Sequence, residues 1–380
     1  MNIYWIEFKL LDKSTNHASR TEIIKYALSI GNNIKYCCGY KSKKKYYGLN
    51  KEVIHYINMP SIPKLRILFL VIGIMNVMLK ALIFIKPDAI IIDYSVNLMT
   101  MPILLIRKIF NKRTKIILDI RTLPVKVQSF RSQIKIFLFS LYMAKITSDG
   151  ITFITHFMRE FCSKHINLLN KKTSIWTSGF NDEIFNPDKY LPSRENDSFK
   201  LFYHGGLSVS RGIGSLIQSV KLLRDKNYPV SLLLIGNIVD KEEINDIVQK
   251  NKLQKFCKIL TPVSYEEVPQ MIKNCDLPVI PLPAFIGWRV SSPIKLIEYM
   301  AMGKSVVLTD IEAHRNVANS YEFAFFADSS KPKHIAAAVE QAYKRKSDLC
   351  ELGEKARELA LKKYTWGLQA DSLLSFIKSL

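Results

Sequence analysis

The stretch LPVIPLPAFIGWRVSSPIKLIEYMAMGKSVVL, residues 277–308, carries the clearest fold signal in the chain. Short apolar runs at 277–281 and 305–308 flank a segment with helical spacing that begins near Pro293. Continuous apolar strands with a helix between them are typical of a parallel sheet that is covered on both faces. The stretch therefore predicts one strand–helix–strand unit of a doubly wound α/β fold.

The same rhythm continues outward along the whole chain. Apolar runs predict strands at 2–8, 33–38, 89–92, 114–118, 150–154, 173–176, 199–204, 230–235, 257–260, 277–281, 305–308 and 324–326. The stretch 186–198 has two prolines, mixed charge and no apolar period, and it predicts a linker. We therefore expect two Rossmann-like doubly wound domains, at 1–190 and 191–365, whose ligand lies in a cleft between them. A final helix over 366–380 could pack back on the first domain.

Composition narrows the class of protein. The 380 residues are 48% hydrophobic and 23% charged, which is typical of a globular chain. Six cysteines occur without a Cys-x-x-Cys pair or a metal-ligand spacing with histidine, which favours a reduced, cytoplasmic compartment. The first residues contain acidic Glu7 within a short apolar run, so they predict a first strand rather than a signal peptide.

The net charge of +22 is unevenly distributed along the chain. Residues 1–190 hold 29 Lys and Arg against 12 Asp and Glu, whereas residues 191–380 hold 26 against 21. A basic face attracts polyanions, and we expect an anionic membrane surface rather than nucleic acid, because no nucleic-acid-binding motif is present. An ordinary solvated basic surface is the alternative.

Two apolar stretches bear on the membrane hypothesis. Residues 67–79 form a 13-residue apolar run, whereas a spanning helix needs about 20 such residues. The run therefore predicts a buried or interfacial helix. Residues 126–145 place apolar and basic side chains at helical spacing, which is typical either of a helix on a membrane surface or of an ordinary domain helix.

Residues 291–304 predict an anion site at a helix N-terminus. Pro293 suits the first helical position and Ser292 the cap, so free amide groups and the helix dipole would face a ligand there. Lys295 adds a charge in the first turn, and Glu298 lies one turn deeper on the same face. This arrangement would hold a diphosphate at the helix tip, and Glu298 would accept hydrogen bonds from ribose hydroxyls. A capped helix with a surface Lys–Glu pair is the alternative.

Two weaker candidates also follow predicted strands. The stretch 203–213 places Gly205 and Gly206 at a strand end and Arg211 at a helix start, which favours phosphate contact but also fits a turn with a solvated arginine. Asp119 and Arg121 follow the strand at 114–118, where they could act on an acceptor or fix their own loop as a pair. The lone histidines His17 and His204 are further candidates, although a lone histidine is more often structural.

Several stretches together resemble a known family. YHGGLSVSRGIGSLIQSVKLL (203–223), VSLLLIGN (230–237), TPVSYEEVPQMIKNCDLPVIPL (261–282) and SSPIKLIEYMAMGKSVVLTD (291–310) are similar, in that order, to the C-terminal domain of family 4 (GT4) glycosyltransferases. ITFITHFMREF (151–161) and IWTSGFNDEIFNP (175–187) resemble the segments that close that family's N-terminal domain. The resemblance covers most of residues 110–370 and implies a GT-B fold.

The resemblance also implies an activity. It suggests a retaining transferase that uses a nucleotide sugar and needs no metal or other cofactor, with a glycan or a lipid-linked molecule as acceptor and the cytoplasmic membrane face as a location. Arg211 stands where the family has its phosphate-binding lysine, and Glu298 stands at the second glutamate of the E-x7-E motif. The expected donor site comprises Gly205, Gly206, Arg211, Val263, Ser291, Ser292, Pro293, Ile294, Lys295 and Glu298. The expected catalytic residues are Asp119, Arg211 and Glu298, and the acceptor side comprises His17, Asp119 and Arg121.

Three positions depart from the family pattern. Gly206 replaces an arginine, Val290 replaces the first glutamate of E-x7-E, and residues 13–18 replace a glycine-rich loop. Arg289 or Lys295 could compensate for the missing arginine. These departures leave two alternatives open: a nucleotide-sugar epimerase on the same fold, and a membrane-associated scaffold without catalysis.

Overall fold

The computed structural model describes residues 1–11, 18–40, 44–60, 62–111, 113–124, 129–193, 198–318 and 321–380. The chain forms two compact units. The first unit consists of Met1–Thr177 together with Trp366–Leu380, and the second consists of Ser178–Thr365. The first unit therefore ends before the stretch 186–198, where the sequence predicts a linker. His17, one of the acceptor-side candidates, lies outside the described residues.

The first unit is built on a parallel sheet in the order β3-β2-β1-β4-β5-β6-β7. Its strands are β1 Asn2–Leu10, β2 Asn33–Gly39, β3 Ile54–Tyr56, β4 Ala89–Ile92, β5 Lys115–Ile120, β6 Gly150–Phe153 and β7 Lys172–Ile175. The central strands are almost entirely apolar and buried, as in β4, because helices cover both faces of the sheet.

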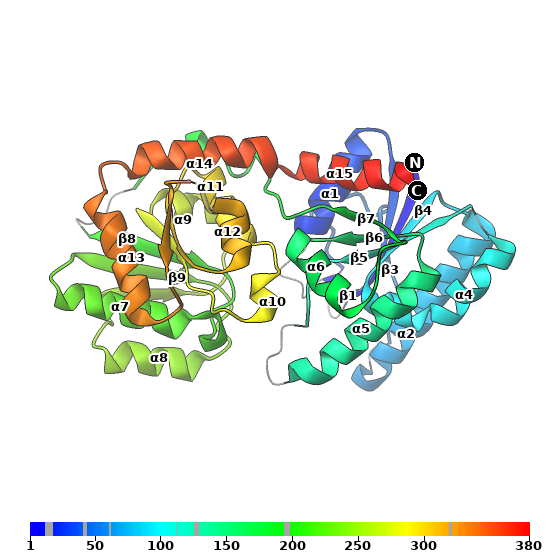
Figure 1. Ribbon diagram of the computed structural model, residues 1–380, viewed down its shortest axis with the longest axis horizontal. Coiled ribbons are helices and arrows are strands. Elements are labelled where there is room, and N and C mark those ends of the chain that lie inside the picture. Colours follow the sequence, from blue (N-terminus) through cyan, green and yellow to red (C-terminus); the bar gives the residue numbers. More distant parts are fainter. Residues whose placement is uncertain are drawn as a thin grey trace. The chain divides into compact units, whose positions relative to one another are not determined.

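Helices form a layer on each side of the first sheet (Figure 1). They are α1 Ala18–Ser29, α2 Pro63–Lys80 with the π-helical turn η2 Ala81–Ile85, α3 Tyr94–Met99, α4 Met101–Phe110, α5 Phe130–Thr147, α6 His156–His165 and α15 Trp366–Ser379. Helix α15 packs against α1 and β7, so the C-terminal end of the chain completes the first unit. Helices α2, α4 and α5 lie on the opposite side of the sheet (Figure 1).

The second unit repeats the plan with a parallel sheet in the order β10-β9-β8-β11-β12-β13. Its strands are β8 Phe199–His204, β9 Val230–Ile235, β10 Cys257–Leu260, β11 Leu277–Ile280, β12 Val306–Thr309 and β13 Ala324–Ala327. Its helices are η4 Pro187–Lys189, η5 Val209–Arg211, α7 Ile213–Asp225, α8 Lys241–Lys250, α9 Val268–Lys273, α10 Ile286–Arg289, α11 Ile294–Ala301, α12 Glu312–Ala318, α13 Pro332–Lys344 and α14 Leu349–Lys363. The predicted α/β class with two doubly wound parallel sheets is confirmed.

Candidate functional site

The strand order of the second sheet fixes where a ligand can bind. From β8 the chain continues to β9 on one side, whereas β11 pairs with β8 on the other. This reversal makes the carboxyl ends of β8 and β11 a topological switch point, where loops diverge and leave room for a ligand. The loop 205–212 follows β8, and the segment 281–293 follows β11 and leads to α11. Most of the predicted donor-site residues lie in these two connections or in the first turns of α11.

Glycines shape the loop after β8. Gly205 has φ +121°, and a Cβ there would lie 2.7 Å from the Nζ of Lys295 and still closer to its Cε. The neighbouring Gly236 has φ +152°, and a Cβ there would lie 2.6 Å from the carbonyl carbon of Gly205. Both positions therefore need glycine. The Lys295 side chain of α11 lies directly against the backbone of Gly205.

Arg211 lies beside the other glycine of this loop. Its guanidinium carbon is 4.4 Å from the centre of the Trp288 ring, which is a favourable cation–π distance. Its Nε would be 3.3 Å from a Cβ at Gly206. The resemblance to family 4 leads one to expect an arginine at position 206. Gly206 stands there instead, and the guanidinium of Arg211 lies beside this glycine. Of the two residues expected to compensate for the missing arginine, Arg289 and Lys295, Arg289 is engaged with Glu312 at 2.8 Å.

Helix α11 starts one residue later than the sequence predicts. It begins at Ile294, Pro293 occupies the cap position, and no side chain caps it. The prediction that Ser292 caps this helix is wrong, because the Ser292 hydroxyl accepts a hydrogen bond from the amide of Ser178 at 3.2 Å. The hydroxyl of Ser291 donates to the carbonyl of Trp288. The amide of Ile294 donates to the carbonyl of Ser292 at 3.1 Å, so the two amides that follow it in the first turn of α11 are the ones without a helical carbonyl.

Glu298 forms a buried network with two aromatic residues. It is 4% exposed, and its Oε2 lies 2.9 Å from Nε2 of His204. The Tyr299 hydroxyl accepts from the amide of His204 and lies 3.1 Å from its Nδ1. Burial raises the pKa of Tyr299, so this hydroxyl is protonated and can donate to Nδ1. The geometry fits a hydrogen bond from the Tyr299 hydroxyl to Nδ1 of His204 and a second from its Nε2–H to Glu298.

Three further positions of the second unit bear on the donor site. The Nζ of Lys295 is 5.4 Å from the centre of the Tyr203 ring. Val263 follows β10 and packs partly buried against the core of the second unit. Val290, where the family has a glutamate, is buried at the end of α10. The sequence did not predict the pairing of His204 with Glu298, because it offered His204 only as a lone candidate.

In the first unit, Asp119 is buried at the end of β5. Its Oδ1 accepts hydrogen bonds from Thr152 Oγ1 at 2.7 Å and from Trp176 Nε1 at 3.0 Å. Its Oδ2 lies 3.7 Å from a guanidinium nitrogen of Arg20. Burial raises the pKa of Asp119 although Arg121 and Arg20 oppose the shift. These contacts tie Asp119 to the interior of its own unit.

Arg121 also points back into the first unit. Its guanidinium donates to the carbonyls of Trp176 and Thr177 and stacks on the Trp176 ring, with the guanidinium carbon 3.3 Å from the ring centre. Burial lowers the pKa of Arg121 to about 9, so it stays charged at neutral pH. The two acceptor-side candidates thus hold the segment at 176–177 in place.

A buried ion cluster adjoins Asp119. Arg20 of α1 donates to Oε1 of Glu7 through Nε at 2.7 Å, and the Tyr36 hydroxyl donates to Oε2 at 2.6 Å. Burial would raise the pKa of Glu7, but Arg20 and Lys9 outweigh it and lower the value to about 2. An acidic residue inside an apolar strand was the signal for this cluster, because a buried carboxylate needs a partner.

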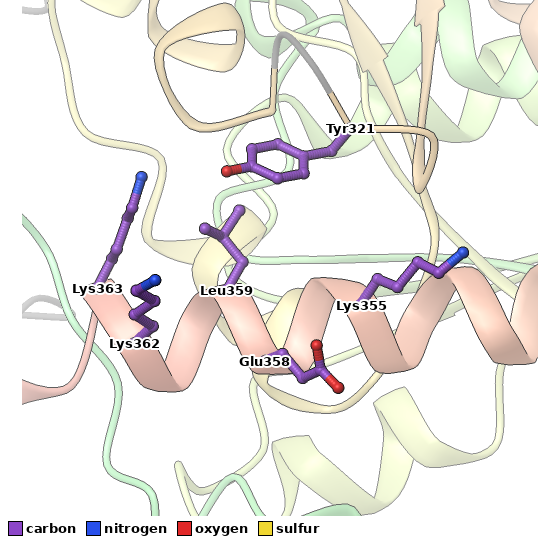
Figure 2. A pocket seen from close by; sticks show the side chains of 6 residues that line it. All are labelled: Tyr321, Lys355, Glu358, Leu359, Lys362 and Lys363. Atoms are coloured by element: carbon purple, nitrogen blue, oxygen red, sulfur yellow. The ribbon is translucent and has the colours of Figure 1, made fainter.

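An open pocket of about 400 Å³ lies elsewhere in the second unit. Figure 2 shows that it is lined by side chains of α14 and one tyrosine: Tyr321, Lys355, Glu358, Leu359, Lys362 and Lys363. Lys355 forms an ion pair with Glu351 at 2.8 Å. None of the predicted site residues lines this pocket. Within the described part of the chain, no three His, Cys, Asp or Glu side chains are grouped closely enough to hold a metal ion.

Comparison with known proteins relates the second unit to glycosyltransferases. Residues 190–359 match the model of glycosyl transferases group 1. The capsular polysaccharide biosynthesis glycosyltransferase CapM of Staphylococcus aureus is 25% identical over 175 residues, 45% of this chain and 43% of that protein. An uncharacterized glycosyltransferase of Methanocaldococcus jannaschii is 25% identical over 184 residues, 46% of this chain and 45% of that protein. The chain thus spans less than half of the length of these curated relatives. The resemblance to glycosyltransferases that the sequence motifs indicate is confirmed for this region.

Solved structures extend the likeness to the whole chain. Sucrose-phosphate synthase from Thermosynechococcus elongatus has a TM-score of 0.81 at 12% identity and covers 100% of this chain and 98% of that one. The Anabaena protein HepE, in complex with UDP-glucose, has a TM-score of 0.77 at 12% identity and covers both chains completely. These likenesses confirm the GT-B fold.

Proposed function

We propose that this protein is a retaining family 4 glycosyltransferase that moves a sugar from a nucleoside-diphosphate sugar to a glycan or lipid-linked acceptor. One observation carries the proposal: Lys295, Arg211 and the His204–Glu298 pair converge at the switch point of the second sheet. This point lies within residues 190–359, which match glycosyl transferases group 1. The UDP-glucose complex of the similar HepE structure supports a nucleotide sugar as donor.

The diphosphate would bind between the loop after β8 and the tip of α11. The ammonium of Lys295, the guanidinium of Arg211 and the first amides of α11 supply charge and hydrogen-bond donors of the kind that phosphates need. As the bond to the sugar breaks, negative charge builds up on the departing nucleoside diphosphate. Fixed donors at that position stabilise the transition state more than the ground state. This set of donors provides the stabilisation without a metal ion.

The nucleoside would extend from the diphosphate toward Glu298. A carboxylate accepts hydrogen bonds from the two ribose hydroxyls, and the hydrogen bond from His204 fixes its orientation. Val263, in the loop after β10, would lie against the base, and Ser291, Ser292, Pro293 and Ile294 would line the approach to the helix tip. In this account His204 is a positioning residue and Glu298 contacts the substrate.

The acceptor side belongs to the first unit in this proposal. The internal contacts of Asp119 and Arg121 favour a role in positioning the segment at 176–177 over direct contact with an acceptor. Because Val290 cannot replace a glutamate in contacting the transferred sugar, that contact must come from other residues. The relationship to a capsular polysaccharide enzyme supports a glycan acceptor.

A transfer assay tests the proposal. Nucleotide sugars are supplied with candidate glycan and lipid-linked acceptors, and release of nucleoside diphosphate is measured for wild type, Lys295→Ala and the surface control Lys250→Ala. We expect acceptor-dependent release, a loss of about 100-fold or more in kcat/KM for Lys295→Ala, and no change for Lys250→Ala. NMR of the product's anomeric proton should show retained configuration.

Two other outcomes would replace the proposal. A new sugar epimer that forms without any acceptor would identify an epimerase. Absence of both turnover and nucleotide binding would identify a scaffold, which the exchanges at Gly206 and Val290 would then explain.

A further inference from the structure

Exposed apolar side chains gather on three helices of the first unit. Of the 26 large apolar side chains that are exposed among the described residues, 17 lie on α2 with η2, on α4 and on α5, so the distribution is strongly one-sided. We call this surface the apolar face. It comprises Leu65, Ile67, Leu68, Phe69, Ile72, Leu79, Ile83, Phe84, Ile85, Leu105, Ile106, Ile109, Phe110, Ile136, Phe139, Tyr142 and Ile146.

Helix α2 is apolar on two opposite sides. Leu70, Ile74 and Met78 are buried against the first sheet, and Gly73 allows the helix backbone to approach the side chain of Ile57 closely. The other side carries the exposed residues of the apolar face. Within the described residues, the segment Leu65–Ile85 is long and apolar enough to cross a membrane, with 28% of its apolar window buried. Because one side packs on the sheet, the helix cannot span a bilayer while the unit is folded.

Hydrogen bonds join the helices of the apolar face into one surface. The side-chain amide of Asn111, at the end of α4, donates to the carbonyl of Leu82 in η2 at 2.7 Å. The side-chain amide of Asn97 in α3 donates to the carbonyl of Ser140 in α5 at 2.9 Å, and α4 packs on α5. Figure 1 shows these helices on one side of the first sheet, opposite α1 and α15. The face is therefore held by the fold and does not depend on a mobile segment.

The charged side chains on the helices of this face have a single sign. The sequences of α2, η2, α4 and α5 contain no Asp or Glu. Exposed basic residues accompany the apolar ones: Lys80 and Lys86 flank η2, and Arg131, Lys135 and Lys145 lie on α5. An apolar surface with only basic charge complements a bilayer that carries anionic lipid headgroups.

We propose that the apolar face lies on an anionic membrane surface, with its apolar side chains in the acyl boundary and its lysines and arginines at the headgroups. A second copy of the chain is a poorer occupant, because a symmetric contact would bring two sets of like charges together. The inference rests on the first unit alone and does not depend on the nucleotide site.

Flotation of the full chain with lipid vesicles tests this proposal. Vesicles of phosphatidylcholine with and without phosphatidylglycerol are compared for wild type, for Phe84→Ser/Ile109→Ser and for Leu191→Ser. Phe84 and Ile109 are 78% and 86% exposed on the apolar face, and Leu191 is an equally exposed leucine (84%) of the second unit. We expect wild type and Leu191→Ser to float with the anionic vesicles. The partition coefficient of the double variant should be lower by about tenfold or more.

Further measurements separate the alternatives. Binding should weaken with salt without disappearing, and Lys135→Glu/Lys145→Glu should reduce it on anionic vesicles. The variants are compared only if their melting temperatures match that of wild type, which exposed substitutions should allow. Absence of vesicle binding by wild type, or equal binding by the double variant, would overturn the proposal. So would a wild-type dimer in solution that the double variant breaks while neither protein binds vesicles.

Discussion

At the scale of the residue, the absence of a side chain at Gly205 leaves room for the ammonium group of Lys295. We predict that Gly205→Ala displaces Lys295 and weakens binding of the nucleoside diphosphate about tenfold or more, because the methyl group would lie against the lysine chain at φ +121°. Calorimetric titration measures the loss. Gly31→Ala is the matched control: it also introduces Cβ at a positive φ of +80°, but nothing lies within 4 Å. Equal affinity of Gly205→Ala and wild type would contradict the assigned position of Lys295.

Arg20 is the centre of the buried ion cluster in the first unit. We predict that Arg20→Met lowers the free energy of unfolding by about 3–5 kcal/mol, since it removes the cation that contacts the buried carboxylates of Glu7 and Asp119. Urea unfolding at neutral pH measures the change. Lys250→Met breaks an exposed ion pair with Asp246 and should cost less than about 1 kcal/mol. A cost for Arg20→Met as small as that of the control would show that the cluster contributes little to stability.

Glu7 should make the first unit sensitive to acid. Its pKa is about 2 in the folded chain against 4.5 as the ordinary value, so its stabilising effect is complete above about pH 4.5 and is lost as pH falls through 2. Asp93, whose pKa burial and Glu7 raise to about 6, titrates above this window. We predict that stability falls less steeply between pH 4.5 and 2 in Glu7→Gln than in wild type. Parallel pH profiles from urea unfolding would contradict this prediction.

Individual site residues could be predicted only where their partners are close in sequence. Lys295 and Glu298 could be recognised because both lie on α11, and Gly205 and Gly206 because they are adjacent in one loop. The pairing of His204 with Glu298 spans 94 residues, and Glu7 meets Arg20 and Tyr36 from other elements. Such contacts depend on the sheet order and leave no local pattern. The role of Ser292 was mistaken because the distant Ser178 amide binds its hydroxyl.

At the scale of the element, α11 depends on its contact with α14. The backbone of Gly353 in α14 packs on the turn after α11, and a Cβ there would lie 2.6 Å from the carbonyl carbon of Gly303. We predict that Gly353→Ala destabilises the second unit by about 1–3 kcal/mol, although alanine favours a helix over glycine. It should also weaken nucleotide binding, because α11 carries Lys295 and Glu298.

Thermal unfolding and nucleotide titration of the variant check both effects. Glu354→Ala is the control, since its side chain is exposed on the same helix and its replacement by alanine should leave both quantities unchanged. A fully stable Gly353→Ala protein would show that α14 can move away from α11 at no cost.

Elements with strong periodicity were predictable. The expected strands at 89–92, 199–204, 230–235 and 257–260 match β4, β8, β9 and β10 at both ends. The edge strand β3 was missed because its three residues, Ile54–Tyr56, alternate around an exposed histidine and are too short to form an apolar run. Continuous apolar runs identify the buried centre of a sheet better than its edge.

At the scale of the whole molecule, the chain passes between its units twice. Helix α15 returns to the first unit and buries Trp366, Leu373, Leu374 and Ile377. We predict that removal of residues 366–380 destabilises the first unit and leaves the second folded. Amide hydrogen exchange should rise within 1–177 and stay unchanged within 178–365. Removal of only 378–380 is the control, and equal protection of the first unit in both truncated chains would contradict the role of α15.

The repeated alternation of strands and helices predicted two doubly wound sheets. It could do so because the buried strands of both units appear in the sequence as apolar runs. The point at which one unit ends could not be derived in the same way. Residues 178–193 carry no strong periodicity, and they belong to the second unit through long-range contacts such as the hydrogen bond from the amide of Phe180 to the carbonyl of Tyr364.

The most direct test of the proposed nucleotide site is thermal stabilisation by a panel of nucleoside diphosphates and nucleotide sugars, on wild type and on Glu298→Ala. We predict that one nucleotide raises the melting temperature of wild type as its concentration increases, and that Glu298→Ala loses most of this shift. No shift with any nucleotide, or an equal shift in both proteins, would contradict the assignment of the site at β8 and α11.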